Sequence, residues 1–396
     1  MIKRQKMNKK KKVGGVIIMH PNHNNYGTSL QGFATVKVIE NLDYDLRIIR
    51  YVKQRSIKEL INTIPGLIRS GALKNFFHDY MKRYDRFLHK DYFENNKIRT
   101  NVVNAFKKKY FDNISDFYYG FHDLHEGSKN YDVIFVGSDQ VWGPLSLYAR
   151  FYNLLFVSDS VPRFSYASSF GVSDILPWQK EGTKKYLDRL NLIGVRELRG
   201  KEMVENLSKN KAYVVADPTM LLSRDDWRKY TCQSKIKIKE PYILCYVLGE
   251  RLDVRNDIKE LAKKLNLKIV SLPHVDQYIK VDNNFGDIQI WNADALDFVN
   301  LIDNAAYVCT DSFHGTVFSI LMHKKFLTYY RQQPTEKRST HARINSLLTI
   351  FGLSDRIFKS DSLSQITQDI DYIKVDRTLG ELRQQSLDFL KRGLNL

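Results

Sequence analysis

Cysteine is scarce in this sequence, which holds only Cys232, Cys245 and Cys309 among 396 residues. None of the three has the spacing of a metal site, and so few thiols fit a reducing compartment. No apolar stretch reaches the ~20 residues that a membrane-spanning helix needs. The apolar run at 16–19, which follows the basic start, is also too short for the apolar region of a signal peptide. We therefore expect a cytoplasmic protein without a bound metal.

Acidic residues are in short supply as well. Lys and Arg number 62 against 44 Asp and Glu, which gives a formal net charge of +18. Such a charge attracts nucleic acid, anionic lipid, or phosphorylated and carboxylated substrates. Seven of the first twelve residues are Lys or Arg, and we interpret 1–12 as a solvated basic tail. No RNP, KH or helix-turn-helix pattern is present, so we expect no nucleic-acid partner, whereas peripheral contact with an anionic membrane stays open.

The chain also lacks internal repeats and low-complexity linkers. From 13 to 235, apolar runs alternate with helical patterns, which favours an α/β domain with a mostly parallel sheet. We expect strands at 13–19, 45–51, 131–136, 163–167, 192–195 and 212–215, and helices at 28–42, 178–190 and 200–207. Residues 53–129 carry many Phe, Tyr, Lys and Arg side chains at helical spacing. We interpret them as a helical insertion packed on the first sheet.

A polar, Lys-rich stretch at 232–240 interrupts this pattern, and a second alternating set follows at 240–345. Here we expect strands at 242–248, 268–272 and 307–310, and helices at 254–265, 295–304 and from about Thr316. Residues 346–396 are expected to form C-terminal helices. Two parallel sheets joined by a short linker predict two lobes with a cleft between them. Ligands of open α/β sheets bind beyond the carboxyl ends of the strands.

The most informative strand end is Thr310-Asp311-Ser312-Phe313-His314-Gly315-Thr316, between an apolar strand and an apolar helix. A glycine lets the backbone approach a ligand, and the free amides at a helix start favour an anion. Ser312, Gly315 and Thr316 thus form a candidate site for a phosphate or carboxylate, with His314 facing it. The alternative is an N-cap beside a structural histidine, but the polar neighbours in a buried setting favour a site.

Two other strand ends carry polar side chains. Gly137-Ser138-Asp139-Gln140 follows the strand at 131–136 and lacks the G-x-G-x-x-G dinucleotide fingerprint. Asp139 is equally suited to a helix cap and to a substrate contact. The stretch from Asn24 to Gln31 joins the first strand to the first helix. It either caps the helix or offers a neutral set for sugar hydroxyls, namely Asn25, Tyr26 and Gln31.

Charged residues follow the remaining strands. Arg196 comes just after the strand at 192–195, where it either forks onto a carboxylate or phosphate or pairs with Glu197. Asp217-Pro218-Thr219 also ends a strand. The polar stretch 329–343 fits either a mobile basic lid or a solvated loop, and it holds Arg331, Lys337, Arg338 and Arg343.

Taken in order, these segments resemble the polysaccharide pyruvyl transferase family, over most of the chain from Gly14 to about Arg356. The shared segments are Asn-Tyr-Gly-Thr-Ser-Leu-Gln at 25–31, Val-Gly-Ser-Asp-Gln-Val-Trp at 136–142, Tyr-Ala-Ser-Ser-Phe-Gly at 166–171, Val-Arg-Glu at 195–197, Asp-Pro-Thr at 217–219 and Thr-Asp-Ser-Phe-His-Gly-Thr at 310–316. Any one of them is modest evidence, whereas six in the same order identify the family strongly.

The resemblance implies two Rossmann-like domains in a GT-B-like arrangement, with phosphoenolpyruvate as the donor. It further implies that His314 is the acid/base residue and that Arg196 lies near the donor. The remaining donor-binding candidates are Ser312, Gly315, Thr316, Arg331, Lys337, Arg338 and Arg343. Strand-end position alone assigns to the acceptor side Asn25, Tyr26, Gln31, Ser138, Asp139 and Gln140.

Forming a pyruvate ketal requires a general acid that also serves as a base, together with cations that hold a trianionic donor. Histidine suits the first task because its ordinary pKa lies near neutral pH. No redox cofactor is required, so we expect none, and the acceptor is expected to be a glycan, including one on a lipid diphosphate. The alternative function is that of a GT-B glycosyltransferase using a nucleotide sugar. An E-x7-E spacing is present at Glu197 and Glu205, but it lies in the first half of the chain, where the donor site of a GT-B glycosyltransferase would not lie.

Overall fold

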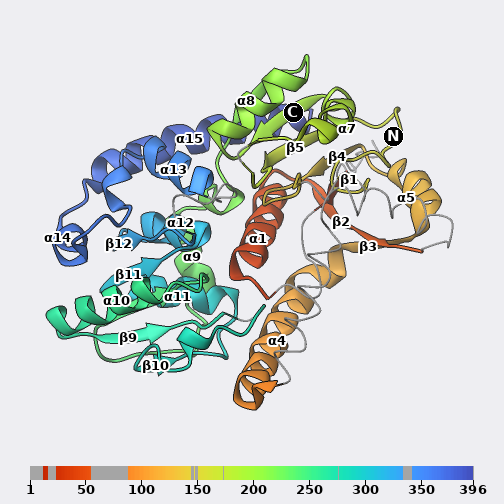
Figure 1. Cartoon of the computed structure of the whole chain (residues 1–396). Coiled ribbons are helices and arrows are strands. Elements are labelled where there is room, and N and C mark those ends of the chain that lie inside the picture. The colour runs from red at the N-terminus through yellow and green to blue at the C-terminus, as the bar shows by residue number, and fades with distance from the viewer. Residues whose placement is uncertain are drawn as a thin grey trace, which may run out of the picture.

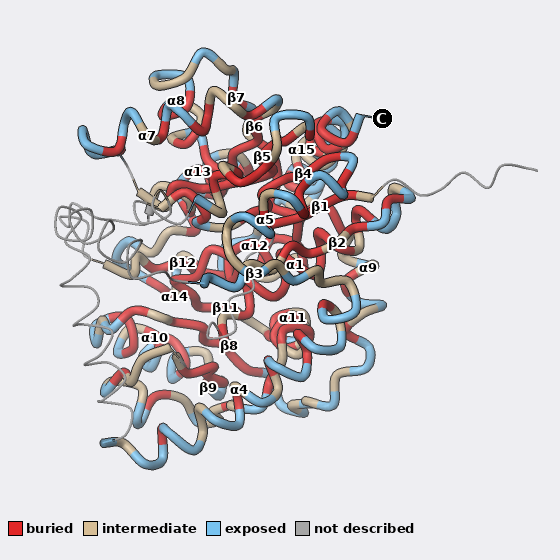
Figure 2. Tube along the Cα trace, turned by 90° about the vertical axis from the view of Figure 1, so that its right-hand side faces the viewer, coloured by how far each residue is buried: buried red, intermediate tan, exposed pale blue. Residues whose placement is uncertain are grey.

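The computed structural model of the chain describes residues 12–16, 24–54, 88–143, 147, 150–172, 174–274, 276–332 and 341–395. Two parallel β-sheets with flanking helices form two lobes, and α1 (Tyr26–Asn41) lies between them (Figure 1). Buried residues concentrate in the strands and on the inward helix faces (Figure 2). The predicted fold class, two Rossmann-like α/β domains, is therefore confirmed. Within the described ranges no helix is both long and apolar enough to cross a membrane.

The first sheet has seven strands in the order β3-β2-β1-β4-β5-β6-β7, and every neighbouring pair is parallel. The central strands β4 and β5 are buried along their whole length, which is typical of a sheet covered on both faces. All six strands predicted for this sheet are present, although residues 17–19 lie outside the described ranges. The strands are β1 (Lys12–Val16), β2 (Asp45–Val52), β3 (Ser115–Tyr119), β4 (Val133–Val136), β5 (Arg163–Ser168), β6 (Leu192–Val195) and β7 (Ala212–Val214).

The predicted insertion at 53–129 is not helical throughout. It contains α4 (Lys90–Phe111), a short 3-10 turn, and α5 (Gly120–Ser128), but also the edge strand β3, which pairs with β2. The helical interpretation was wrong for β3, because consecutive aromatic residues there follow the strand preference rather than the helical spacing. Residues 55–87 of the insertion lie outside the described ranges.

The insertion also extends beyond the first sheet. Arg99 of α4 donates hydrogen bonds to the backbone oxygens of Trp291 (2.9 Å) and Ile290 (2.6 Å), which belong to the second lobe. Figure 1 shows α4 running from the edge of the first sheet down to β10. The prediction placed the insertion on the first sheet only, whereas α4 joins the two lobes.

The second sheet has five parallel strands in the order β10-β9-β8-β11-β12. Its strands are β8 (Tyr242–Tyr246), β9 (Lys268–Ser271), β10 (Ile288–Gln289), β11 (Tyr307–Thr310) and β12 (Lys325–Thr328). The helices between them are α10 (Leu252–Leu265), α11 (Ala295–Asn304) and α12 (Phe313–Leu321). The prediction started α12 near Thr316, but Ser312 caps it, so the helix already begins at Phe313.

Helix α1 is buried on nearly every side, which is why its sequence carries no clear polar face. It packs on α11 and α12 of the second lobe as well as on its own sheet. The hydrophobic core is consequently continuous from one lobe to the other. The other helical elements of the first lobe are α7 (Pro177–Leu187), α8 (Leu198–Leu207), the 3-10 turn η2 (Pro218–Met220) and α9 (Arg224–Thr231).

The C-terminal segment forms α13 (His341–Ile350), α14 (Ser362–Thr367) and the long helix α15 (Tyr372–Gly393). Helix α15 returns to the first lobe. The Ser386 hydroxyl accepts a hydrogen bond from the Ala216 backbone N–H at 2.8 Å, and the Phe389 ring fills the space left by the missing side chain of Gly194. The chain therefore crosses between the lobes a second time, and this crossing ties the two sheets together.

Candidate active site

Polar and charged side chains meet where the carboxyl ends of β4 to β7 face the start of α12. Ser138 and Asp139 follow β4, Arg196 follows β6 and Asp217 follows β7. His314 approaches from the second lobe in the first turn of α12. Both sheets are parallel and thus bring their strand ends to one edge, so residues far apart in the sequence converge between the lobes.

The position of His314 is fixed by the turn that precedes it. The Asp311 carboxylate accepts hydrogen bonds from the backbone N–H groups of Leu248 (2.8 Å) and Gly249 (2.7 Å). The Ser312 hydroxyl then caps α12 by accepting from the N–H of Gly315 at 3.3 Å. Only 6% of His314 is exposed. Of the two interpretations of this motif, the N-cap is therefore real, and it presents the histidine to the first lobe.

His314 faces the carboxylate of Asp217, with 3.6 Å between Nε2 and Oδ2. The side chain of Asp217 is fully buried and also accepts hydrogen bonds from Ser138 Oγ (2.8 Å) and Thr219 Oγ1 (2.7 Å). Burial by itself raises the pKa of Asp217, but the positive charge of protonated His314 and that of Arg196 outweigh it, and the pKa lies well below its ordinary value. Asp217 is therefore a carboxylate at any physiological pH and lies beside the His314 ring.

Asp217 is not among the predicted site residues, although the sequence places it at the end of a strand. A buried Asp that ends a strand on the same edge as Arg196 was the signal that could have found it. The sequence does not show which strand lies beside which, and this order decides that Asp217, rather than Glu197, pairs with Arg196.

Arg196 lies in the centre of the cluster. Its Nη1 donates to Asp217 Oδ2 at 3.2 Å, and its Nη2 is 3.7 Å from Asp139 Oδ1. The guanidinium also covers the ring of Phe313, 4.3 Å from its centroid. The neighbouring Glu197 instead accepts from Ser169 Oγ at 2.8 Å, so the alternative Arg196–Glu197 pair has no support. Burial raises the pKa of Glu197, and the charge of Arg196 only partly offsets this.

The strand end after β4 supplies three neighbours of this cluster. Ser138 binds Asp217, as described, and Asp139 accepts from Thr28 Oγ1 of α1 at 3.1 Å. Asp139 has a positive φ of 86°, which is uncommon for a residue other than glycine. Burial tends to raise the pKa of Asp139, but Arg196, His314 and Arg343 together lower it. The Gln140 amide, turned with its oxygen toward α13, accepts from Arg343 Nη1 at 2.9 Å.

Two more arginines reach the same region from the second lobe. Arg343 of α13 is partly buried, and this burial, together with the like charge of Arg196, lowers its pKa to about 10. Arg331, which follows β12, lies 3.6 Å from Asp311 Oδ1 through its Nη2. Of the other predicted donor-binding cations, Lys337 and Arg338 lie outside the described residues.

Several N–H groups of this cluster are buried without any hydrogen-bond acceptor among the described residues. They are Nε and Nη2 of Arg196, Nε of Arg331 and Nε of Arg343; Nε2 of His314 is likewise buried without a hydrogen-bond partner. Buried polar groups in native proteins are nearly always satisfied, so each of these calls for an explanation. Donors without acceptors, held by positive side chains, fit the oxygens of an anionic ligand.

The predicted acceptor residues of the first α1 turn are placed differently from one another. Asn25 is the N-cap of α1, with its side chain accepting from Gly27 N at 2.8 Å. Tyr26 is 1% exposed and stacks on Phe298 of the second lobe with ring centroids 4.8 Å apart. Gln31 is completely buried and donates to the Thr28 backbone oxygen. Tyr26 and Gln31 thus pack inside the protein.

Within the described ranges, no group of three or more His, Cys, Asp or Glu side chains is placed to hold a metal ion. Ser312, Gly315 and Thr316 are all buried in the first turn of α12. The Thr316 hydroxyl shares a hydrogen bond with the Thr328 hydroxyl at 3.0 Å and also contacts the Ser312 backbone oxygen. Its role in the described structure is to hold α12 on β12.

Two facing Rossmann-like domains with the candidate site between them define the GT-B-like class. The chain is similar to a UDP-GlcNAc 2-epimerase from Neisseria meningitidis bound to UDP-GlcNAc, with 11% identity, coverage of 96% of this chain and 99% of that one, and a TM-score of 0.51. It is also similar to an S. aureus MnaA–UDP complex, with 14% identity, 98% and 97% coverage, and a TM-score of 0.50. At such identities the likeness shows the fold alone.

The sequence itself is more specific than the fold. No curated protein matches the chain, but the family model described as polysaccharide pyruvyl transferase matches residues 25–333. That range spans most of the chain and both lobes, and it includes Arg196, Asp217 and His314. The chain therefore belongs to the polysaccharide pyruvyl transferase family, as its motifs predict.

Proposed function

We propose that this protein transfers pyruvate from phosphoenolpyruvate, as a ketal, onto a sugar of an exopolysaccharide, capsule or cell-wall polysaccharide precursor and releases phosphate. The observation that carries the proposal is the group of buried guanidinium N–H donors on Arg196, Arg331 and Arg343 beside His314. Phosphoenolpyruvate offers a carboxylate and a phosphate within one small molecule. These two groups match several convergent cations better than a neutral sugar does.

Charge supports the same donor. Burial, and after it the like charge of Arg196, lowers the pKa of Arg343, although both guanidinium groups stay protonated at neutral pH. Asp139 and Glu197 oppose this lowering, and Asp311 lies 3.6 Å from Arg331, so nearby carboxylates compensate part of the positive charge. A trianion placed between the guanidinium groups offsets the remaining repulsion between them. Relief of this repulsion, which is present in the ligand-free protein, strengthens ligand binding.

His314 is suited to the proton transfers. In the proposed reaction its imidazolium protonates the methylene carbon of phosphoenolpyruvate, and an acceptor hydroxyl attacks the adjacent carbon as positive charge develops there. The C–O bond to phosphate then breaks and a second hydroxyl closes the ketal. One hydroxyl proton restores His314, and the other leaves with phosphate. Asp217, which stays ionised, stabilises the imidazolium at 3.6 Å without taking the proton.

The acceptor is proposed to enter beside Ser138, Asp139 and Gln140, which line the carboxyl end of β4. A lipid-diphosphate-linked glycan, a cytoplasmic location and peripheral contact with an anionic membrane belong to the same proposal, supported by the net charge of +18. The reaction needs no cofactor besides its co-substrate.

The competing function is transfer of a sugar from a nucleotide sugar. Family membership favours pyruvate transfer, and the spacing of Glu197 and Glu205 gives glycosyl transfer no support. Glu197 is bound to Ser169, and Glu205 accepts from the Ala212 backbone N–H.

Ligand-induced thermal stabilisation of the purified protein tests the choice of donor without an acceptor. A ligand at ~100 times its dissociation constant adds about 2.7 kcal/mol to the free energy of unfolding. We expect phosphoenolpyruvate to raise the melting temperature and UDP-sugars to leave it unchanged. Stabilisation by UDP-sugars with no response to phosphoenolpyruvate would reject the proposal in favour of glycosyl transfer.

A further inference from the structure

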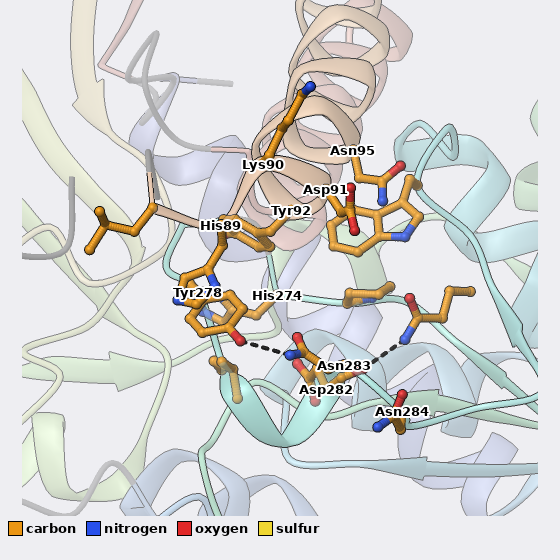
Figure 3. A pocket seen from close by; sticks show the side chains of 15 residues that line it. His89, Lys90, Asp91, Tyr92, Asn95, His274, Tyr278, Asp282, Asn283 and Asn284 are labelled. Atoms are coloured by element: carbon orange, nitrogen blue, oxygen red, sulfur yellow. Dashed lines mark hydrogen bonds between the residues drawn. The ribbon is translucent and has the colours of Figure 1, made fainter. Parts of the chain in front are cut away.

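A hollow lies away from the cluster around His314, between the start of α4 and the segment that joins β9 to β10. Its volume is about 460 Å³, which is large enough for a small organic ligand. One wall belongs to the insertion of the first lobe and the other to the second lobe (Figure 3). No residue of the proposed pyruvyl transfer lines it.

Aromatic rings make up much of the lining. His89 stacks on Tyr278 with centroids 3.6 Å apart, and Tyr92 meets the edges of Tyr278 (5.5 Å) and Trp291 (5.9 Å). The rings hold one another in place, so the wall is preformed. Ligand binding therefore has a small entropic cost for ordering these side chains. Amphipathic rings of this kind offer an apolar surface together with polar tips.

Neutral amides face the rings. Asn95 lies on α4, whereas Asn283, Asn284 and Gln289 lie on the opposite wall. Asn283 donates to Tyr278 Oη at 2.7 Å. Gln289 donates to the backbone oxygens of Asp282 (2.7 Å) and Phe285 (3.1 Å), so it offers a ligand only its oxygen. An asparagine amide carries both donors and acceptors, as does each sugar hydroxyl, so the two can bind in either direction. Aromatic faces interleaved with amides are therefore suited to a neutral, many-hydroxyl ligand.

The charges of the hollow argue against an anionic ligand. The Asp282 carboxylate is engaged by Arg255, whose Nη2 and Nε donate at 2.7 and 2.9 Å. Lys90 extends away from Asp282 and Asn283 (Figure 3). In contrast to the cluster around His314, no guanidinium of the described residues lines this hollow. A phosphate or nucleotide diphosphate would thus meet Asp91 and Asp282, with Lys90 as the lining's Lys or Arg side chain in the described part of the chain.

Helix α4 links the hollow to the candidate active site through side-chain contacts. Arg99 of α4 binds the backbone oxygen of Trp291 and lies over the Tyr26 ring, 4.6 Å from its centroid. One residue further along α4, Thr100 accepts from Asn24 Nδ2 at 2.8 Å, directly before the first turn of α1. Lys90 and Thr100 are ten residues apart on α4, which is about 15 Å along a helix. A chain of several sugar residues spans this distance.

We propose that this hollow is a distal saccharide subsite, which binds a sugar residue of the glycan acceptor remote from the residue that receives pyruvate. The proposal rests on the proposed function for the identity of the acceptor. The subsite extends contact with the acceptor beyond the reacting hydroxyls and thereby selects a glycan of sufficient length.

The test is glycan-array binding by the full-length protein, without phosphoenolpyruvate, using neutral oligosaccharides from disaccharides to hexasaccharides and UDP as a nucleotide probe. The test variant is Asn95→Ala/Asn284→Ala, which removes one amide from each wall. We expect its affinity for the retained glycans to fall about tenfold, since each lost hydrogen bond weakens binding several-fold. The matched control is Asn104→Ala, on the exposed side of the same helix, which should bind as wild type does.

Three results would overturn the subsite. They are equal glycan binding by the wild type and the double variant, no retained glycan at all, and retention of UDP in place of glycans.

Pyruvyl transfer to a monosaccharide and to a longer acceptor separates this proposal from the proposed function. If both hold, the double variant raises KM for the longer acceptor only. If the protein transfers pyruvate to both acceptors but the variant changes neither KM, the subsite proposal is rejected and the proposed function stands. Glycan binding that the variant weakens, without any turnover of phosphoenolpyruvate, would reject the proposed function alone.

Discussion

The imidazole of His314 packs directly on the backbone of Gly27, so closely that a Cβ atom added at Gly27 would lie 2.0 Å from Nδ1. Gly27 belongs to the first turn of α1 in one lobe, and His314 to the first turn of α12 in the other. Asp217 is on the opposite side of the ring, 3.6 Å from Nε2. The histidine is therefore held between a glycine and a carboxylate, and the distance between the lobes determines its position.

Gly27→Ala should displace His314 while the protein still folds, because the nearest atoms are those of one side chain rather than of backbone. A displacement of about 1 Å costs on the order of a hundredfold in turnover. We expect kcat to fall by about that factor with the far-ultraviolet circular dichroism unchanged.

Gly380→Ala is the matched control: it lies on an exposed face of α15 with no atom within 4 Å of the new Cβ. It should raise stability by about 0.5–1 kcal/mol and leave kcat unaltered. A Gly27→Ala enzyme with normal kcat would show that His314 is not the acid.

Arg196→Lys should weaken the donor site although it keeps the charge. A lysine has no planar fork, so it cannot bind Asp217 and a ligand oxygen together. We expect the stabilisation by phosphoenolpyruvate to decrease by about 1–2 kcal/mol, measured as the shift of the melting temperature against ligand concentration. Arg199→Lys, on the exposed face of α8 where it pairs with Glu202, should keep the wild-type shift. An unchanged shift in Arg196→Lys would exclude Arg196 from the donor site.

Asp217→Asn should lower stability in a pH-dependent way. The pKa of Asp217 is depressed in the folded protein, so the folded state binds fewer protons than the unfolded state around the ordinary aspartate pKa of about 3.9. Its contribution is thus fully present above that pH and is lost as the pH falls through and below it. We expect the variant to lose about 3 kcal/mol in urea unfolding at pH 7. The difference from wild type should stay constant down to about pH 5 and shrink below pH 4. A difference that grows with acidity would contradict the assignment.

Arg99→Ala should loosen the joint between α4 and the second lobe. The change leaves the backbone oxygens of Ile290 and Trp291 without their donor and removes the cation from the Tyr26 ring. Arg99 is 1% exposed, so water cannot easily replace it. We expect a loss of about 2–4 kcal/mol in chemical denaturation. Lys97→Ala, at an exposed position of the same helix, should change stability by less than about 0.5 kcal/mol. Equal effects of the two substitutions would show that the contacts of Arg99 do not stabilise the packing of α4 on the second lobe.

Much of the fold could be predicted because its strands are buried on both faces. β4 is an apolar run followed by Gly137 and polar residues, whereas β5 alternates polar residues with Phe164, Tyr166 and Ala167; each pattern is recognisable without a partner. β3 was missed because it is a short, half-exposed edge strand within a longer stretch whose other aromatic residues have helical spacing. Its identity as a strand depends on pairing with β2, which sequence spacing does not reveal.

The site was predictable to the extent that parallel strands end at one edge. This rule predicts that Arg196, Ser138, Asp139 and His314 lie near one another, as they do in the structure. It does not predict which side chains face one another, and Tyr26 stacks on Phe298 whereas Gln31 binds the Thr28 backbone oxygen. Strand order, together with the docking of the lobes, also chose Asp217 as the partner of Arg196 and His314.

The alternation of strands and helices, the two parallel sheets, the polar strand ends and the family can be recognised in the sequence, because they depend on local patterns of a few residues each. The contact between Gly27 and His314, and the position of Asp217 beside both His314 and Arg196, come from the folded structure. It alone placed α4 against the second lobe, where a hollow lined by aromatic rings and amides results. The reason is physical: contacts between segments hundreds of residues apart are set by how two lobes pack, and side-chain burial follows from that packing rather than from residue type.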